Sequence, residues 1–261
     1  KVIVMEFRII ALDMDGTLLD AAGQIPDSFW PVLEELRSRG VAVAPASGRQ
    51  LATLRAIFPG DTFIAENGTC VFHEGEVVST TLLDAATVHS VIDAAAGLDM
   101  DLVVCTPTVA HHLPGISAAT EAELAKYYHS RQETEDLHSV TDVIKLAGFT
   151  TGDAEREIYP ALLDAAPDAN VVVSGAHWVD IMAAGAGKGR ALTALAEAMG
   201  VGKHQIAAFG DYLNDLELLQ AAGTAWAMEN AHPDIKAIAH HIAPPNTEAG
   251  VVTVLRDLLR Q

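Results

Sequence analysis

The stretch Phe7-Arg8-Ile9-Ile10-Ala11-Leu12-Asp13-Met14-Asp15-Gly16-Thr17-Leu18 decides the fold. Its apolar run from Phe7 to Leu12 is rich in Ile and stops at Asp13 and Asp15, which predicts a strand with two carboxylates at its carboxyl end. These carboxylates are two positions apart and therefore point the same way, while Gly16 allows a sharp exit from the strand. The sequence thus predicts a strand that places two acids at one edge of a sheet.

Working outward from this strand, helices and strands alternate in both flanking parts of the chain. Alternation of this kind indicates a parallel sheet. The predicted fold class is therefore α/β, with a doubly wound, Rossmann-like parallel-sheet core. Its predicted helices cover residues 27–39, 51–58, 188–199, 213–221 and 247–260, and its strands cover 41–46, 63–65, 206–209 and 224–228.

The alternation changes near Leu82 into paired strands joined by turns, which suggests an antiparallel sheet with helices packed on it. We therefore expect a catalytic core over residues 1–82 plus 182–261 and an inserted α+β cap domain over 83–181. Within the insert, the predicted helices cover 84–96, 117–130 and 153–166, and the strands cover 101–105, 109–113, 142–149, 170–174 and 178–181.

The charge of the chain limits its partners. Sixteen Lys and Arg against thirty-five Asp and Glu give a net charge of -19, which repels nucleic-acid backbones and anionic lipid surfaces. We therefore expect no nucleic acid and no membrane as partners. An acidic protein that binds a small phosphorylated metabolite must build a local positive site from a metal, Lys or backbone amides.

Two further features indicate a cytoplasmic protein. The opening Lys1-Val2-Ile3-Val4 is too short for a signal-peptide core, and no apolar run approaches the roughly 18 residues of a membrane-spanning helix. Cys70 and Cys105 are too few for a disulfide framework, and we interpret both as buried apolar residues.

Ligands of open parallel sheets bind at the carboxyl ends of the strands. At the carboxyl end of the first predicted strand, one of Asp13 and Asp15 can attack phosphorus while the other moves protons. A turn in which Asp caps backbone amides is about as common when this motif is taken alone.

Two more strand-end clusters offer groups that bind phosphate. The Ser47 hydroxyl and the amides of Ser47-Gly48-Arg49 could hold phosphate oxygens, although an ordinary helix cap is the commoner use of such a motif alone. Lys188 in Gly185-Ala186-Gly187-Lys188-Gly189 superficially resembles an ATP-binding P-loop. That interpretation fails, because Gly189 stands where a magnesium-binding Ser or Thr belongs.

The fourth cluster is Gly210-Asp211-Tyr212-Leu213-Asn214-Asp215, directly after an apolar strand. With Asp13 and Asp15 it makes a dense acidic edge that would repel itself if left without a cation. Magnesium prefers carboxylate and water oxygens, so Mg²⁺ is the predicted cofactor.

The four clusters, in this order, resemble the motifs of the haloacid dehalogenase-like (HAD) superfamily. Glu66-Asn67-Gly68, Lys188-Gly189 and Met228-Glu229-Asn230-Ala231 more narrowly resemble its Cof-type branch of sugar-phosphate phosphatases. The resemblance covers both core segments, roughly residues 7–82 and 181–261. It implies a magnesium-dependent phosphoric monoester hydrolase that acts on small phosphorylated metabolites, sugar phosphates above all, through an aspartyl-phosphate intermediate.

The same resemblance implies a role for each site residue. Asp13 would be the nucleophile and Asp15 the general acid/base. Ser47, Gly48, Lys188 and Asn214 would contact the phosphoryl group, and the metal would be held by Asp13, the Asp15 carbonyl, Asp211 and, through water, Asp215. The cap would select the substrate.

Two alternative functions remain at this point. A phosphomutase would return the phosphoryl group to a sugar, whereas a non-catalytic protein would only bind the phosphometabolite. We expect His111, His112, Trp178, His240 and His241 to be solvated or structural residues, because packed or solvated side chains are the commoner cases.

Overall fold

The computed structural model describes residues 7–260, so the opening Lys1-Val2-Ile3-Val4 lies outside the described residues. Within them, the chain divides into two compact units. The first comprises residues up to 48, 60–79 and 187 onward, and the second comprises 49–59 and 80–186.

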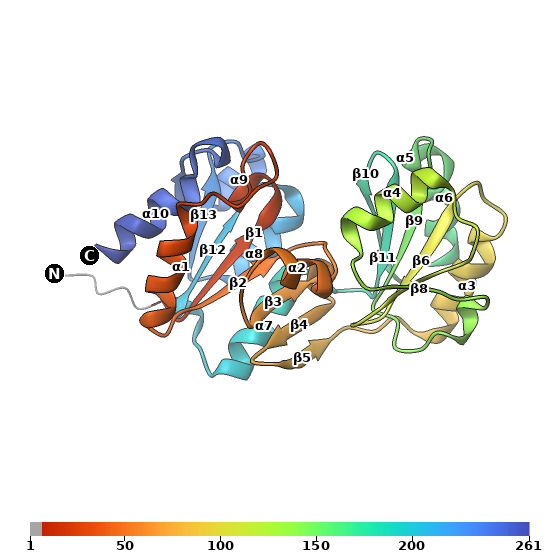
Figure 1. Cartoon of the computed structure of the whole chain (residues 1–261), viewed down its shortest axis with the longest axis horizontal. Coiled ribbons are helices and arrows are strands. Elements are labelled where there is room, and N and C mark those ends of the chain that lie inside the picture. Colours follow the sequence, from red (N-terminus) through yellow and green to blue (C-terminus); the bar gives the residue numbers. More distant parts are fainter. Residues whose placement is uncertain (1–6, 261) are drawn as a thin grey trace. The chain divides into compact units, whose positions relative to one another are not determined.

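An eight-stranded sheet forms the first unit, in the order β14-β13-β12-β1-β2-β3-β4-β5 (Figure 1). β1 (Ile9–Asp13) is fully buried and pairs in parallel with β12 (Ile206–Gly210) and β2 (Ala42–Ala46). Parallel pairing continues from β12 to β13 (Thr224–Met228) and β14 (His241–Ala243), and from β2 to β3 (Thr62–Ala65). The predicted parallel core is confirmed and also contains β14, which is outside the predicted set of strands, while the strands β4 (Cys70–His73) and β5 (Glu76–Thr80) lie at the opposite edge.

The direction of the chain explains why this sheet is doubly wound. From β1 the chain moves outward to β2 and β3, whereas from β12 it moves the opposite way to β13 and β14. Since crossovers between parallel strands are right-handed, helices on these two routes cover opposite faces. The packed helix pairs are α1 (Phe29–Ser38) with α10 (Gly250–Leu259), and α7 (Lys188–Met199) with α8 (Leu216–Ala221).

The second unit contains a six-stranded sheet in the order β10-β11-β9-β6-β7-β8. All its pairs are antiparallel except β7 with β8. Every second residue of its central strands joins an apolar core with α3 (Ala85–Ala95) and α6 (Tyr159–Ala165), as the period of a strand requires. The strands are β6 (Asp101–Cys105), β7 (Ala110–His112), β8 (Arg131–Glu133), β9 (Lys145–Phe149), β10 (Asn170–Gly175) and β11 (Trp178–Met182).

Two predicted helices of the insert differ from the observed ones. The predicted helix over 117–130 ends three residues early, as α4 (Ala118–Tyr127), and the chain goes on to β8. The predicted helix over 153–166 is divided into α5 (Ala154–Glu157) and α6. The break falls at Ile158, because Pro160 near the start of α6 has no backbone N–H to continue the preceding helix.

Side-chain hydrogen bonds explain why residues 49–59 group with the second unit. They carry α2 (Leu51–Ile57). Gln50 Nε2 donates to the Ser130 carbonyl at 2.8 Å, and Thr53 Oγ1 donates to the Tyr127 carbonyl at 2.8 Å. These hydrogen bonds connect residues 49–59 to the end of α4.

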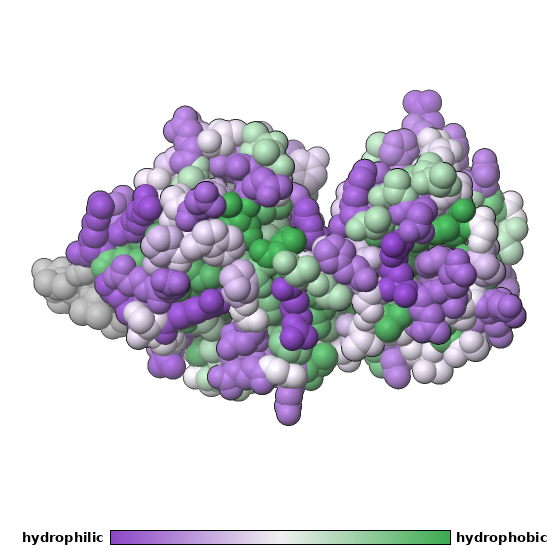
Figure 2. Space-filling model, viewed as in Figure 1, coloured by the Kyte–Doolittle hydropathy of each residue, from purple (hydrophilic) through white to green (hydrophobic). Residues whose placement is uncertain are grey.

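Neither cysteine forms a disulfide, and Cys70 and Cys105 are both buried, as expected. Among the described residues, no helix is both long and apolar enough to span a bilayer. Hydrophilic side chains are spread over the visible face of both units, and apolar ones lie between them in small groups (Figure 2).

Candidate active site

The carboxyl end of β1 carries the first site residue. Asp13 is the last residue of β1, and its side chain is buried. The chain then turns sharply at Gly16, where φ is +77° and a Cβ would lie 2.2 Å from Asp211 Oδ2. Only glycine fits this conformation and this close approach. Asp15 lies on this turn with its side chain exposed.

Lys188 is a buried cation that contacts Asp13. It is the first residue of α7 and is 2 % exposed. Its Nζ donates to Asp13 Oδ1 at 2.5 Å and to Asp215 Oδ1 at 2.7 Å. A buried ammonium needs such partners, so the lysine joins two carboxylates that are separated by about two hundred residues of sequence.

The loop after β12 supplies the remaining acids. Asp215 is fully buried, and its Oδ2 accepts hydrogen bonds from the backbone N–H groups of Asp211 and Tyr212 at 3.1 and 3.2 Å. Thr17 Oγ1 donates to Asp211 Oδ1 at 3.4 Å. The turn after β1 and the turn after β12 are therefore joined at their acidic residues.

Burial and mutual repulsion perturb the acids. Burial, and then the Asp215 charge, raise the pKa of Asp13 to about 8 even though Lys188 lowers it. The same two causes raise the pKa of Asp211 to about 6. The pKa of Lys188 is also raised, because attraction to Asp13 and Asp215 outweighs the opposing effect of burial. The site therefore holds more negative charge than its single lysine can neutralise.

The donor set fits a hard divalent cation. Asp13, Asp211 and Asp215 each offer a carboxylate oxygen, and these oxygens lie within 4.8 Å of one another. Within residues 7–260, no other group of three or more His, Cys, Asp or Glu side chains brings its ligand atoms this close together. Carboxylate oxygens suit Mg²⁺, and a cation here would oppose the repulsion that raises the two pKa values.

A cavity of about 400 Å³ opens above these groups. It brings together all the predicted site residues except Asp215, which lies buried beneath it. Gly16 and Tyr212 also line the cavity and are absent from the predicted set. Both stand inside the motifs that the sequence singled out, and Tyr212 is 59 % exposed. The lining residues are Asp13, Asp15, Gly16, Ser47, Gly48, Lys188, Asp211, Tyr212 and Asn214.

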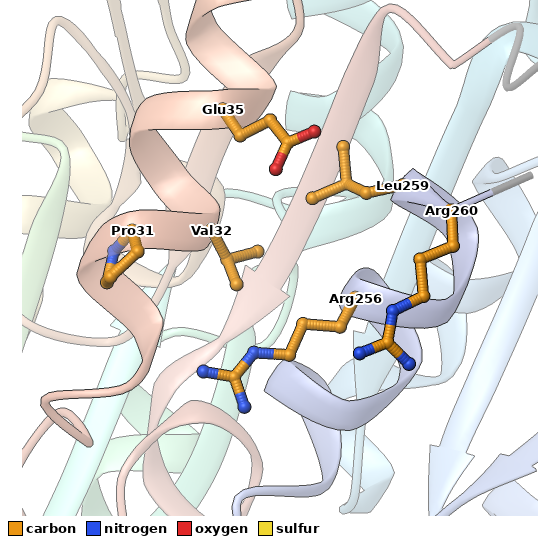
Figure 3. A pocket seen from close by; sticks show the side chains of 6 residues that line it. All are labelled: Pro31, Val32, Glu35, Arg256, Leu259 and Arg260. Carbon is orange, nitrogen blue, oxygen red and sulfur yellow. The ribbon is translucent and has the colours of Figure 1, made fainter.

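A second cavity of the first unit, of about 240 Å³, lies between α1 and α10 (Figure 3). It is lined by Pro31, Val32, Glu35, Arg256, Leu259 and Arg260. Glu35 accepts a hydrogen bond from Arg39 Nη2 at 2.6 Å, and Arg256 Nη2 donates to the Ser28 carbonyl at 3.3 Å. These charges have local partners, and this cavity lacks the carboxylate pair of the first.

The five residues excluded from the predicted site are solvated or structural, as expected, but His112 needs a correction. His112 is buried rather than solvated, because it lies on β7 and its Nδ1 donates to the Leu113 carbonyl at 2.9 Å. Trp178 packs against Phe149, with ring centroids 4.9 Å apart. His240 Nδ1 accepts from the Ala225 N–H at 2.9 Å, which agrees with a structural role.

Comparison with known proteins agrees with this geometry. The profile of the haloacid dehalogenase-like hydrolases matches residues 10–255. The chain belongs to this family. The predicted resemblance, including its Cof-type branch, is confirmed.

Several relatives of this hydrolase are phosphatases of nearly equal length. It is 28 % identical to the Escherichia coli 5-amino-6-(5-phospho-D-ribitylamino)uracil phosphatase YbjI, over 98 % of this chain and 97 % of that protein. It is 27 % identical to the Bacillus subtilis phosphatase YwpJ, over 97 % of this chain and all of that protein. A solved structure from Eubacterium rectale, 28 % identical, matches with a TM-score of 0.87 over 97 % of this chain and 99 % of that one. This hydrolase is a phosphatase.

Proposed function

We propose that this phosphatase hydrolyses small phosphorylated metabolites, with sugar phosphates as the main class, through a phosphoryl group carried on Asp13 and with Mg²⁺ as cofactor. The observation that carries the proposal is the pairing of Asp13 and Asp15 in one cavity with Lys188 bonded to the first of them. A nucleophile, a second acid and a fixed cation are the groups that phosphoryl transfer through an acyl phosphate requires.

In the first step, an Asp13 carboxylate oxygen attacks phosphorus while the bond from phosphorus to the ester oxygen breaks. Asp15 gives a proton to the departing oxygen, so that an alcohol leaves. Water then attacks phosphorus, Asp15 accepts a proton from it, and the bond to Asp13 breaks to release inorganic phosphate. Because Asp15 is exposed in the cavity, it can exchange protons with leaving group and water in turn.

Four residues are proposed to hold the phosphoryl oxygens. Ser47 and Gly48 directly follow β2, next to β1, and line the cavity with Lys188 and Asn214. The hydroxyl, backbone amide, ammonium and side-chain amide groups of these residues are all hydrogen-bond donors that suit phosphate. Their position at one sheet edge would keep the phosphorus in line with Asp13.

The proposed metal ligands are Asp13, Asp211 and the backbone carbonyl of Asp15, with Asp215 acting through water. When bound, Mg²⁺ supplies positive charge that offsets the charge developing on the transferring group. Lys188 donates hydrogen bonds to Asp13 and Asp215, and the Asp211 and Tyr212 amides fix Asp215.

Two arguments support the substrate class. The Escherichia coli relative is named for a substrate whose phosphate is carried on a ribityl chain, a sugar-like polyol. An acidic chain with one buried cation in the cavity can also hold a small phosphate more easily than a polyanion. We further propose that residues 83–181 form a cap that selects among such substrates.

The test is phosphate release from sugar phosphates, nucleotides and pyridoxal phosphate, with Mg²⁺ and with chelator. We expect release that depends on Mg²⁺ and is lost, by about 10⁴-fold or more, in Asp13→Asn, because an amide cannot form the acyl phosphate. The matched control is Asp27→Asn, the same change at an exposed acid. Undiminished activity in Asp13→Asn would reject the nucleophile, and transfer to a second sugar without net phosphate would indicate a mutase.

A further inference from the structure

The turn that carries Asp15 accepts two hydrogen bonds from side chains far along the sequence. Asn230 Nδ2 donates to the Gly16 carbonyl at 2.8 Å, and Asn246 Nδ2 donates to the Leu19 carbonyl at 2.8 Å. The two asparagines are also joined, because the Asn246 N–H donates to Asn230 Oδ1 at 3.0 Å. Asn230 and Asn246 together therefore link the carbonyl of Gly16 to the carbonyl of Leu19.

The two asparagines come from neighbouring strands of the first unit. Asn230 follows β13, and Asn246 follows β14. Between them, the His232 N–H donates to the Asp211 carbonyl at 2.8 Å. The loop after β13 thus contacts both the Asp15 turn and the loop that carries Asp211. Its segment Met228-Glu229-Asn230-Ala231 has no role in the chemistry proposed above.

The turn around Asn246 has an uncommon backbone. Ala249 has φ +51°, a left-handed conformation that a residue with a Cβ rarely adopts. A Cβ at Gly250 would lie 1.8 Å from the Pro244 carbonyl oxygen, so the chain is closely packed here. Strained conformations of this kind persist where the surrounding structure requires one geometry, and they gather at functional sites.

Water could satisfy the Gly16 carbonyl at little cost, because its bond with Asn230 is exposed. Unlike water, the two linked asparagine side chains fix the positions of the Gly16 and Leu19 carbonyls relative to β13 and β14. The Gly16 carbonyl is separated from Asp15 by a single peptide unit. A shift at that carbonyl would therefore move the Asp15 carboxylate.

We propose that Asn230 and Asn246 are positioning residues that hold Asp15 where it can exchange a proton with the leaving group. Neither amide lines the cavity, so both act through the turn. This inference rests on the proposed function, in which Asp15 is the general acid/base.

The first experiment compares leaving groups in Asn230→Asp and Asn246→Ala. Asn230→Asp keeps the acceptor for Asn246 but replaces the donor to Gly16 by an oxygen, and Asn246→Ala removes the donor to Leu19. We expect kcat/KM for a sugar phosphate to fall about 10²-fold, as small misplacements of catalytic groups do. The loss for p-nitrophenyl phosphate should be much smaller, because its leaving group needs no proton.

A double-mutant cycle with Asp15→Asn separates positioning from a structural role. In the Asp15→Asn background, either asparagine change should cost less than about threefold in kcat/KM, since the group that it positions is already gone. Asn170→Asp, the same chemical change on β10 of the second unit, is the control for the added charge. Melting curves show that each variant is folded, and Asn246→Ser replaces Asn246→Ala if the latter is not.

Three outcomes overturn the inference. They are full activity in folded variants, an equal loss for both leaving groups, or a loss that is just as large without Asp15. If the native enzyme releases no phosphate from any substrate, the proposed function fails first and this inference falls with it. Native activity with unaffected asparagine variants rejects the positioning role alone.

Discussion

The two cavities of the first unit differ in how deeply their charged residues are buried. The larger one collects acids and a lysine from β1, α7 and the loop after β12, segments that lie far apart in the sequence. The smaller one also takes its charges from distant segments, α1 and α10, but Glu35 is exposed and pairs with Arg39 four residues away on the same helix. Burial of converging charges perturbs their pKa values, whereas solvent screens pairs on helix surfaces. Burial of the charges, more than their presence, therefore marks the site.

The sharpest way to test this difference is to remove the buried cation. Lys188→Met leaves Asp13 and Asp215 without their partner and should lower phosphatase activity by about 10³-fold or more. Breaking a buried ion pair should also lower the free energy of unfolding by about 3 kcal/mol, measured by urea denaturation. Arg256→Met, the matched change at the smaller cavity, should alter neither. Similar losses in both variants would contradict the comparison.

The next largest effect is expected at Gly16. In Gly16→Ala, the new Cβ would force the Asp211 carboxylate to move, and the positive φ would cost about 1 kcal/mol of stability. We expect kcat to fall about 10²-fold, because Asp211 and the Asp15 turn are both displaced. Steady-state kinetics and thermal melting measure the two effects. Loss of stability with unchanged kcat would show that the close approach is structural only.

The pH dependence of stability sharpens the comparison further. The pKa of Asp13 is raised to about 8 and that of Asp211 to about 6, so the folded metal-free protein binds more protons than the unfolded chain above about pH 4. Stability from these two acids is therefore fully present below about pH 4 and is lost as pH rises, to about 6 for Asp211 and to about 8 for Asp13. The raised pKa of Lys188 does not change this range, because the lysine stays protonated in both states.

We therefore expect added Mg²⁺ to raise the melting temperature more at pH 8 than at pH 5, since the cation competes with protons for the carboxylates. Asp13→Asn should reduce this difference between the two pH values. Melting curves with Mg²⁺ and with chelator at both pH values measure it. An equal Mg²⁺ effect at both would place the ion elsewhere.

The smallest effect is expected at the rim of the smaller cavity. Glu35→Gln weakens the exposed pair with Arg39, which solvent already screens, so the free energy of unfolding should change by less than about 1 kcal/mol. Phosphatase activity should be unchanged, because the pair touches none of the residues that line the larger cavity. A loss of activity in Glu35→Gln would show that the two cavities are coupled.

Much of the core could be predicted because its signals are local. The apolar run that ends at Asp13, and the strand that ends before Asp211, each predict a strand end without knowledge of the rest. The insert was harder, since its helices depend on contacts. α4 ends at Tyr127, where Thr53 of α2 donates a hydrogen bond to the Tyr127 carbonyl. No sequence pattern predicts that contact. The burial of His112 likewise follows from its place on β7.

From the sequence alone follow the order of most strands and helices of the core, the family, which acids and serine come after core strands, and that Lys188 begins a helix. These follow from short-range periodicity and from motifs of a few residues. Only the tertiary structure decided that Lys188 bonds Asp13 and Asp215, that Gly16 lies against Asp211, and that Asn230 and Asn246 hold the Asp15 turn. Each of these contacts joins residues more than twenty-five positions apart, so its geometry depends on how the parallel strands bring their ends to one edge.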